Sequence, residues 1–150
     1  MTFAVGSVRV RVPATSANLG PGFDALGLAL ARYDDLAARV TGDGLRIEIA
    51  GEGAESAPRD ESHLVVRAMR RTFEVLGVEP AGLALECENR IPHSRGLGSS
   101  AAAIVAGVLL AWGLVDGAVD RLPAGELLGL DDLHQPGIAR VGLGVDDVDA

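Results

Sequence analysis

Hydrophobic and polar positions alternate with a period of two in three stretches of the chain. The clearest runs from Val8 to Val12, where valines are separated by arginines, and it ends at Pro13. The same alternation recurs at 45–49 and 83–88. Successive side chains of a strand point to opposite faces, so each stretch predicts a strand with one buried face.

A helical period replaces the alternation after a polar, acidic loop at residues 51–61. Apolar residues recur three and four positions apart between Val65 and Leu76, which predicts an amphipathic helix. We expect this helix to begin near Asp60 or Ser62, either of which can cap it, and to end at Gly77.

Two apolar segments complete the predicted order of elements. Residues 25–40 are interrupted only at 32–35 and fit strand or helix equally well. Residues 101–115 form the longest apolar run, which is too short to span a bilayer and predicts a buried helix. Strands and helices in this order predict an α+β fold.

A glycine-rich, hydroxyl-bearing segment precedes that last helix and is the most informative part of the chain. Gly96 and Gly98 lack Cβ atoms, so their backbone can approach a bulky anion. Ser99 and Ser100 fall at the cap and first turn of the helix, where free N–H groups and the helix dipole favour negative charge. The pattern predicts a cradle for nucleotide phosphates. It is not a Walker A loop, and a plain strand-to-helix turn is the alternative interpretation.

A second polar loop, residues 13–24, follows the first predicted strand. The Asn18 amide and the Asp24 carboxylate can together bind a small amino alcohol. The alternative is a series of turns through Asn18, Gly20 and Gly22, with Asp24 as a cap.

Composition limits the class of protein. The 150 residues are 48% hydrophobic and carry a net charge of −8, as expected of about one globular domain. This charge argues against nucleic acid or an anionic membrane as a partner. No signal peptide is recognised at the N-terminus, so we expect a cytoplasmic location.

Two further side-chain groups have ordinary structural explanations. The single cysteine, Cys87, lies in an alternating apolar stretch and is predicted to be a buried structural thiol rather than a nucleophile. Arg67, Arg70 and Arg71 are predicted to lie on the solvated face of their helix.

Both polar segments resemble motifs of known small-molecule kinases. Residues 13–24, PATSANLGPGFD, resemble the first motif of homoserine kinases, and residues 92–102 resemble the second motif of the wider GHMP kinase group. The resemblance covers about residues 5–128. It implies the N-terminal domain of a GHMP kinase, with the ribosomal protein S5 domain 2 type of fold, over residues 1–130.

The resemblance also implies an activity and roles for individual residues. It implies transfer of the γ-phosphoryl group of ATP to the hydroxyl of L-homoserine, with Asn18 and Asp24 at the substrate. Asp24 is the implied catalytic residue and contacts the ammonium or the hydroxyl of the substrate. It acts either as a base or by orienting the hydroxyl, and we favour orientation. The resemblance implies Mg²⁺ bound by Ser100 or Ser99. The residues implied around ATP are Pro92, Arg95, Gly96, Leu97, Gly98, Ser99, Ser100, Ala101 and Ala102.

The end of the chain departs from the family pattern. Residues 116–150 hold eight acids and two arginines, and from 131 onward they show no helical or strand period. We therefore expect a poorly ordered, acidic tail at 131–150, with the second domain of the family absent. Apolar surface left by that absence is compatible with a homo-oligomer.

Three hypotheses follow from the resemblance and the departure. The chain is a homoserine kinase, an inactive nucleotide-binding fragment, or a GHMP-type kinase acting on another alcohol. Activity of this chain is expected to be weak or absent unless the remainder is supplied.

Overall fold

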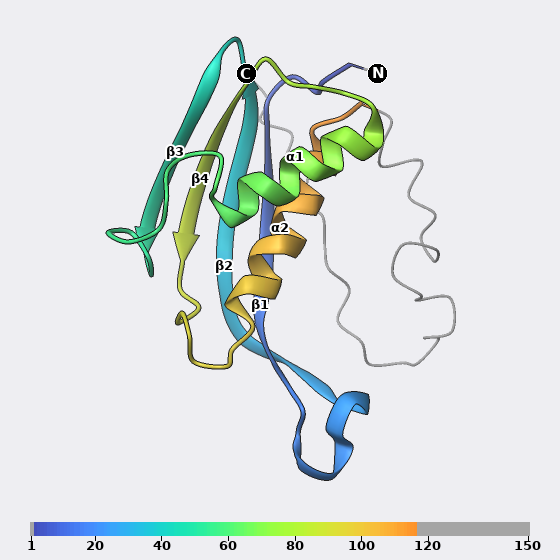
Figure 1. The fold of residues 1–150 in the computed structure, drawn as a ribbon, viewed down its shortest axis with the longest axis vertical. Helices are drawn as coiled ribbons and strands as arrows, with labels where there is room; N and C mark the ends of the chain where they lie inside the picture. Colours follow the sequence, from blue (N-terminus) through green and yellow to red (C-terminus); the bar gives the residue numbers. More distant parts are fainter. Residues whose placement is uncertain (1, 117–150) are drawn as a thin grey trace.

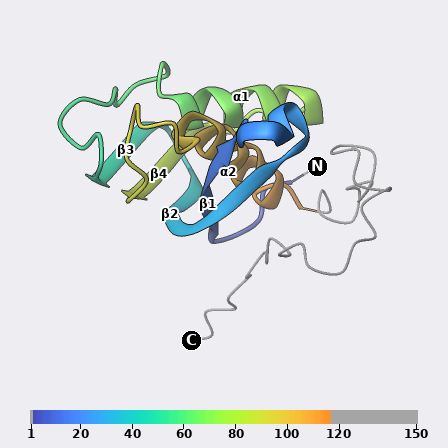
Figure 2. The same cartoon turned by 90° about the horizontal axis from the view of Figure 1, so that it is seen from below.

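A four-stranded sheet is covered on one face by two helices in the part of the chain that the structure describes (Figure 1, Figure 2). The structure is a computed structural model that describes residues 2–116, and at Pro21, Phe23 and Asp24 it describes the backbone alone. The predicted α+β class is confirmed. In chain order the elements are β1 (Ser7–Ala17), a 3₁₀ helix (Gly20–Ala25), β2 (Gly27–Thr41), β3 (Gly44–Gly51), α1 (Leu64–Leu76), β4 (Gly82–Asn89) and α2 (Ser99–Gly113).

The strands lie in the order β1-β2-β4-β3. β1 and β2 form a long antiparallel hairpin, β2 is antiparallel to β4, and β3 is parallel to β4. The alternating stretches at 8–12, 45–49 and 83–88 are confirmed as strands. The ambiguous segment 25–40 is strand β2 from Gly27 onward, because both edges of this strand pair with neighbours in the sheet.

The predicted end of the first strand at Pro13 is wrong. β1 continues to Ala17, and Pro13 pairs with Tyr33. Proline is tolerated in an edge strand or at a bulge, where its missing N–H removes no hydrogen bond from the ladder. Pro13 meets both conditions, since β1 is an edge strand and the register shifts between Pro13 and Ala14.

The core lies between the sheet and the helices. The strands turn apolar side chains such as Val10, Val12, Leu36 and Leu85 to the helices and most of their charged side chains to solvent. Asp34 on β2 is the buried exception among the charged residues of the described strands. α2 packs on β1, and α1 packs on α2. The expectation that the helix at 101–115 is buried is only partly correct. On the outer side of α2, Ile104 and Val105 are about half exposed. No helix in residues 2–116 combines the length and apolarity needed to cross a membrane.

The boundaries of α1 correct one expectation and confirm another. The N-cap is His63 rather than Asp60 or Ser62, because the Asp60 carboxylate accepts hydrogen bonds from the N–H and hydroxyl of Ser62 instead. Gly77 ends the helix in the left-handed conformation with φ 69°, as predicted. The expected solvent-facing arginines are confirmed, with Arg70 and Arg71 in ion pairs at the surface.

Candidate functional site

The segment between β4 and α2 has the backbone geometry of an anion cradle. Gly96 and Gly98 both have φ of 70°, in the left-handed region that favours glycine. Gly98 is the N-cap of α2 and offers no side-chain acceptor, so the capping role expected of Ser99 is wrong. Ser99 and Ser100 occupy the first turn instead. The N–H groups of that turn have no carbonyl partner within the helix, and the dipole favours an anion in front of them.

Thr15 joins the two polar segments that the sequence singled out. Its N–H donates to the carbonyl oxygen of Leu97 at 3.0 Å. A Cβ atom at Gly98 would lie 2.1 Å from Thr15 Oγ1, so β1 fits against the cradle only because residue 98 has no side chain. Strand β1 is therefore in contact with the cradle at a point close to the tip of the β1–β2 hairpin.

A cavity of about 500 Å³ opens in front of the cradle, within the size range of small-ligand sites. It is lined by most of the residues predicted around ATP: Gly96, Leu97, Gly98, Ser99, Ser100 and Ala101. Three predicted residues do not line it. Pro92 and Arg95 lie elsewhere on the loop, and Ala102 is buried in the core.

His63 is a cavity residue that the sequence interpretation missed. Its side chain is 7% exposed, and its buried Nδ1 has no hydrogen-bond partner in the described part of the protein. Burial is the main cause that lowers the pKa of His63, and Arg59 lowers it further against an opposing effect of Asp60. A neutral imidazole with an unused nitrogen is suited to a polar ligand atom. No motif marks this histidine in the sequence.

Asp34 and Cys87 also line this cavity. Cys87 is buried and its thiol pKa is raised to about 12, chiefly by desolvation and then by Asp34. The thiolate is the reactive form of cysteine, and a raised pKa disfavours it. The predicted burial of Cys87 is confirmed. Asp34 is the second cavity residue that the sequence interpretation missed, because it could not tell which acid of residues 32–35 faces inward.

The predicted substrate residues Asn18 and Asp24 lie at the tip of the β1–β2 hairpin, which extends beyond the sheet (Figure 1). Asn18 is exposed with φ of 58°, and its carbonyl accepts the N–H of Gly20 at 3.1 Å. This is the turn geometry of the alternative interpretation. The backbone of Asp24 is part of the 3₁₀ helix, and Asn18 does not line the cavity.

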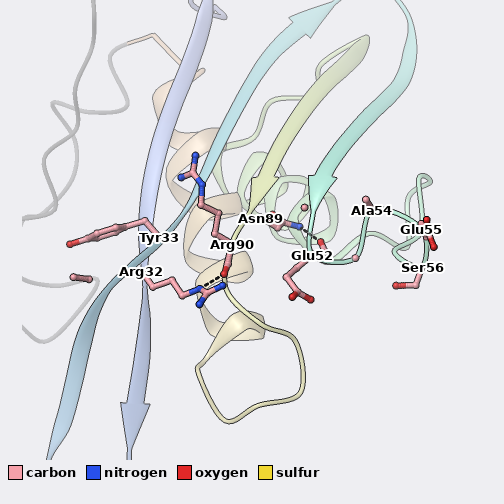
Figure 3. Close-up of a pocket in the computed structure, with 11 residues that line it drawn as sticks. Arg32, Tyr33, Glu52, Ala54, Glu55, Ser56, Asn89 and Arg90 are labelled. Atoms are coloured by element: carbon pink, nitrogen blue, oxygen red, sulfur yellow. Dashed lines mark hydrogen bonds between the residues drawn. The ribbon is translucent and has the colours of Figure 1, made fainter.

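A wider groove of about 1110 Å³ lies beside the carboxyl ends of β3 and β4 (Figure 3). Arg32, Tyr33 and Arg90 line one side, and Glu52 and Glu55 lie on the loop opposite. The described residues contain no group of three or more histidine, cysteine or acidic side chains placed to hold a metal ion.

Comparison with known proteins gives a consistent family match. Residues 63–148 match the family described as GHMP kinases N terminal domain. The chain is 60% identical over 128 residues to the homoserine kinase of Streptomyces coelicolor, covering 85% of this chain and 41% of the relative. It is 55% identical over 129 residues to the homoserine kinase of Leifsonia xyli, covering 85% and 40%. The chain thus spans about two-fifths of the length of these relatives.

Solved structures show the same likeness in three dimensions. The homoserine kinase of Cytophaga hutchinsonii matches with a TM-score of 0.60 and 34% identity, over 73% of this chain and 36% of that one. The mevalonate kinase of Methanococcus jannaschii matches with a TM-score of 0.55 over 73% and 40%, at 16% identity, which supports the fold alone.

Proposed function

Because this chain belongs to the GHMP kinase family, through the N-terminal domain of that family, we propose that its cradle binds the phosphates of ATP. GHMP kinases are ATP-dependent kinases. The observation that carries the proposal is the left-handed Gly96–Gly98 backbone at the N-terminus of α2, open to a cavity. In a chain with a net charge of −8, local N–H groups and the helix dipole supply the attraction for an anion.

The remaining lining of the cavity supports a nucleoside site. It includes the apolar Ala57 and Pro58 together with the imidazoles of His63 and His93. Apolar surface combined with a few polar groups that fix orientation is typical of small-ligand pockets. We place the base of the nucleotide there, with the unpartnered nitrogen of His63 available to a polar atom of the ring.

The first turn of α2 also fits Mg²⁺ binding. Mg²⁺ prefers oxygen ligands and usually takes one or two from the protein and the rest from phosphates and water. The hydroxyls of Ser99 and Ser100 are oxygens of this kind beside the cradle. Bound there, Mg²⁺ would neutralise charge on the phosphate oxygens.

The phosphoryl acceptor is proposed to be L-homoserine, held by Asn18 and Asp24. Relatives named homoserine kinase support this choice of substrate. The hydrogen bond from Thr15, three residues before Asn18, to Leu97 of the cradle supports the placing of the hairpin tip near the proposed phosphate site. Phosphoryl transfer depends mainly on positioning and charge stabilisation, so Asp24 needs only to orient the hydroxyl. A place in threonine biosynthesis and in the cytoplasm follows from this proposal.

The test is homoserine-dependent release of ADP from ATP with Mg²⁺, on the wild-type chain beside Asp24→Asn. Turnover that requires homoserine and falls sharply in the variant supports the kinase proposal. Release driven instead by another alcohol, such as mevalonate, points to a different GHMP-type substrate.

A nucleotide-binding fragment without turnover is the second candidate. The observation in its favour is that the chain spans about two-fifths of its relatives' length. We therefore expect turnover to be weak or absent unless the remaining length is supplied in trans. A folded chain that binds MgATP and releases no ADP supports this candidate.

A further inference from the structure

Two side chains of β2 form hydrogen bonds with the start of the cradle loop, residues 90–98 between β4 and α2. The β2–β4 ladder ends at the pair Asp35–Glu88. Beyond it, Asp34 Oδ1 accepts the N–H groups of Arg90 at 2.6 Å and of Ile91 at 2.8 Å. Arg32 Nε donates to the carbonyl oxygen of Arg90, as Figure 3 shows. Both backbone groups of residue 90 are therefore fixed by side chains of the neighbouring strand.

Burial makes the Asp34 contacts important. Asp34 is 6% exposed and Ile91 is fully buried, so removing the acceptor leaves a buried N–H without a partner. A carboxylate also makes stronger hydrogen bonds to N–H groups than a neutral acceptor does. Among residues 2–116 no cation forms an ion pair with Asp34. In the described part of the chain, the side chain of Asp34 accepts its hydrogen bonds from the backbone of residues 90 and 91.

The other end of the loop is held by β1, through the hydrogen bond from Thr15 to Leu97. Between these two anchors lie Ser94 and Gly96, both in the left-handed conformation. A loop that depends on such conformations keeps its shape only where its surroundings fix it. The two strands of one hairpin therefore determine where the cradle begins and ends.

From this geometry we propose that Asp34 is a positioning residue for the phosphates of the nucleotide. It touches no phosphate and acts by fixing residues 90 and 91, so that the cradle is preorganised. This inference rests on the proposed binding of ATP. Asp34 also lines the same cavity as the cradle, on the side of β2.

The experiment compares wild type with Asp34→Ala, Asp34→Asn and the control Glu86→Ala, which removes an exposed acid on β4. Calorimetric titrations give the affinities for MgATP and for adenosine, and hydrogen–deuterium exchange follows the amides of residues 90–98. We expect Asp34→Ala to weaken MgATP about tenfold and adenosine by less than about twofold. The amides of Arg90 and Ile91 should exchange faster, Asp34→Asn should be intermediate, and Glu86→Ala should match wild type.

The proposal is overturned if a folded Asp34→Ala chain binds MgATP as tightly as wild type does. It is also overturned if the affinity for adenosine falls by the same factor as the affinity for MgATP. If Asp34→Ala does not fold, Asp34→Asn is the deciding variant, because its amide keeps an acceptor oxygen. A loss of affinity for MgATP alone supports the positioning role, and unchanged affinity for MgATP overturns it. If the wild type itself binds no MgATP, the proposed function fails instead. Exchange at residues 90–98 then decides whether Asp34 holds the loop.

Discussion

Gly98 carries two structural demands at once. Its φ of 70° is strained for any residue with a Cβ, and that Cβ would lie 2.1 Å from Thr15 Oγ1. Gly98→Ala should therefore displace the cradle from β1 and weaken MgATP binding by about tenfold or more. Calorimetric titration of the variant with MgATP measures this loss.

Substitutions at two other glycines distinguish the effect of backbone strain at Gly98 from the effect of the clash with Thr15. Gly96 and Gly44 also have positive φ, but a Cβ at either meets no atom within 4 Å. Gly96→Ala should weaken MgATP less than Gly98→Ala does, and Gly44→Ala should leave binding unchanged. Equal losses at Gly96 and Gly98 would show that contact with Thr15 does not matter.

His63 predicts a pH dependence of stability. Its pKa in the folded protein lies below the ordinary 6.5, mainly through burial. Between these two values the unfolded chain binds the proton more readily, so the free energy of unfolding falls as pH drops below 6.5 and is unaffected above it. Urea unfolding at pH 7.5 and 5.5 measures the loss. A His63→Asn chain should lose less stability over this range, and an identical loss would count against the assignment.

At the scale of elements, the packing of α1 on α2 depends on Gly107. A Cβ there would lie 2.5 Å from the carbonyl oxygen of Val65 and 2.7 Å from Ala68 Cβ. Alanine gains about 1 kcal/mol of helix propensity over glycine, but a clash with backbone forces the helices apart. Gly107→Ala should therefore destabilise the fold by about 1–3 kcal/mol in urea unfolding.

A surface position on the same helix is the control for Gly107. Ile104 is 46% exposed, so truncation removes little buried area. Ile104→Ala should change the free energy of unfolding much less than Gly107→Ala. A stable Gly107→Ala chain would mean that the two helices pack less closely than the structure indicates.

Elements with a clear hydrophobic periodicity could be predicted from the sequence, whereas element ends that depend on strand pairing could not. The alternating stretches and the buried face of α1 could be predicted because burial of one side of an element leaves a periodic pattern of apolar residues. The course of β1 through Pro13 depends on its place at the sheet edge, which no local pattern reveals. The cradle glycines were recognisable as a motif. Asp34 and His63 were not, because their inward orientation depends on register and on tertiary packing.

At the scale of the molecule, one hairpin connects the two candidate binding segments. Its tip carries Asn18 and the backbone of Asp24, and its strands are hydrogen-bonded to both ends of the loop at 90–98. The domain boundary predicted at residue 130 and the tail at 131–150 lie outside the described residues. Within the described residues, the part of the fold that we propose to bind a nucleotide is complete.

The most direct measurement is a calorimetric titration of the wild-type chain with MgATP, repeated with inorganic tripolyphosphate as competitor. We predict saturable binding at a single site, weakened by the competitor because both ligands present phosphates to the N-terminus of α2. A folded chain that takes up no MgATP, or whose binding is indifferent to tripolyphosphate, would contradict the assignment of residues 96–101 as a phosphate cradle.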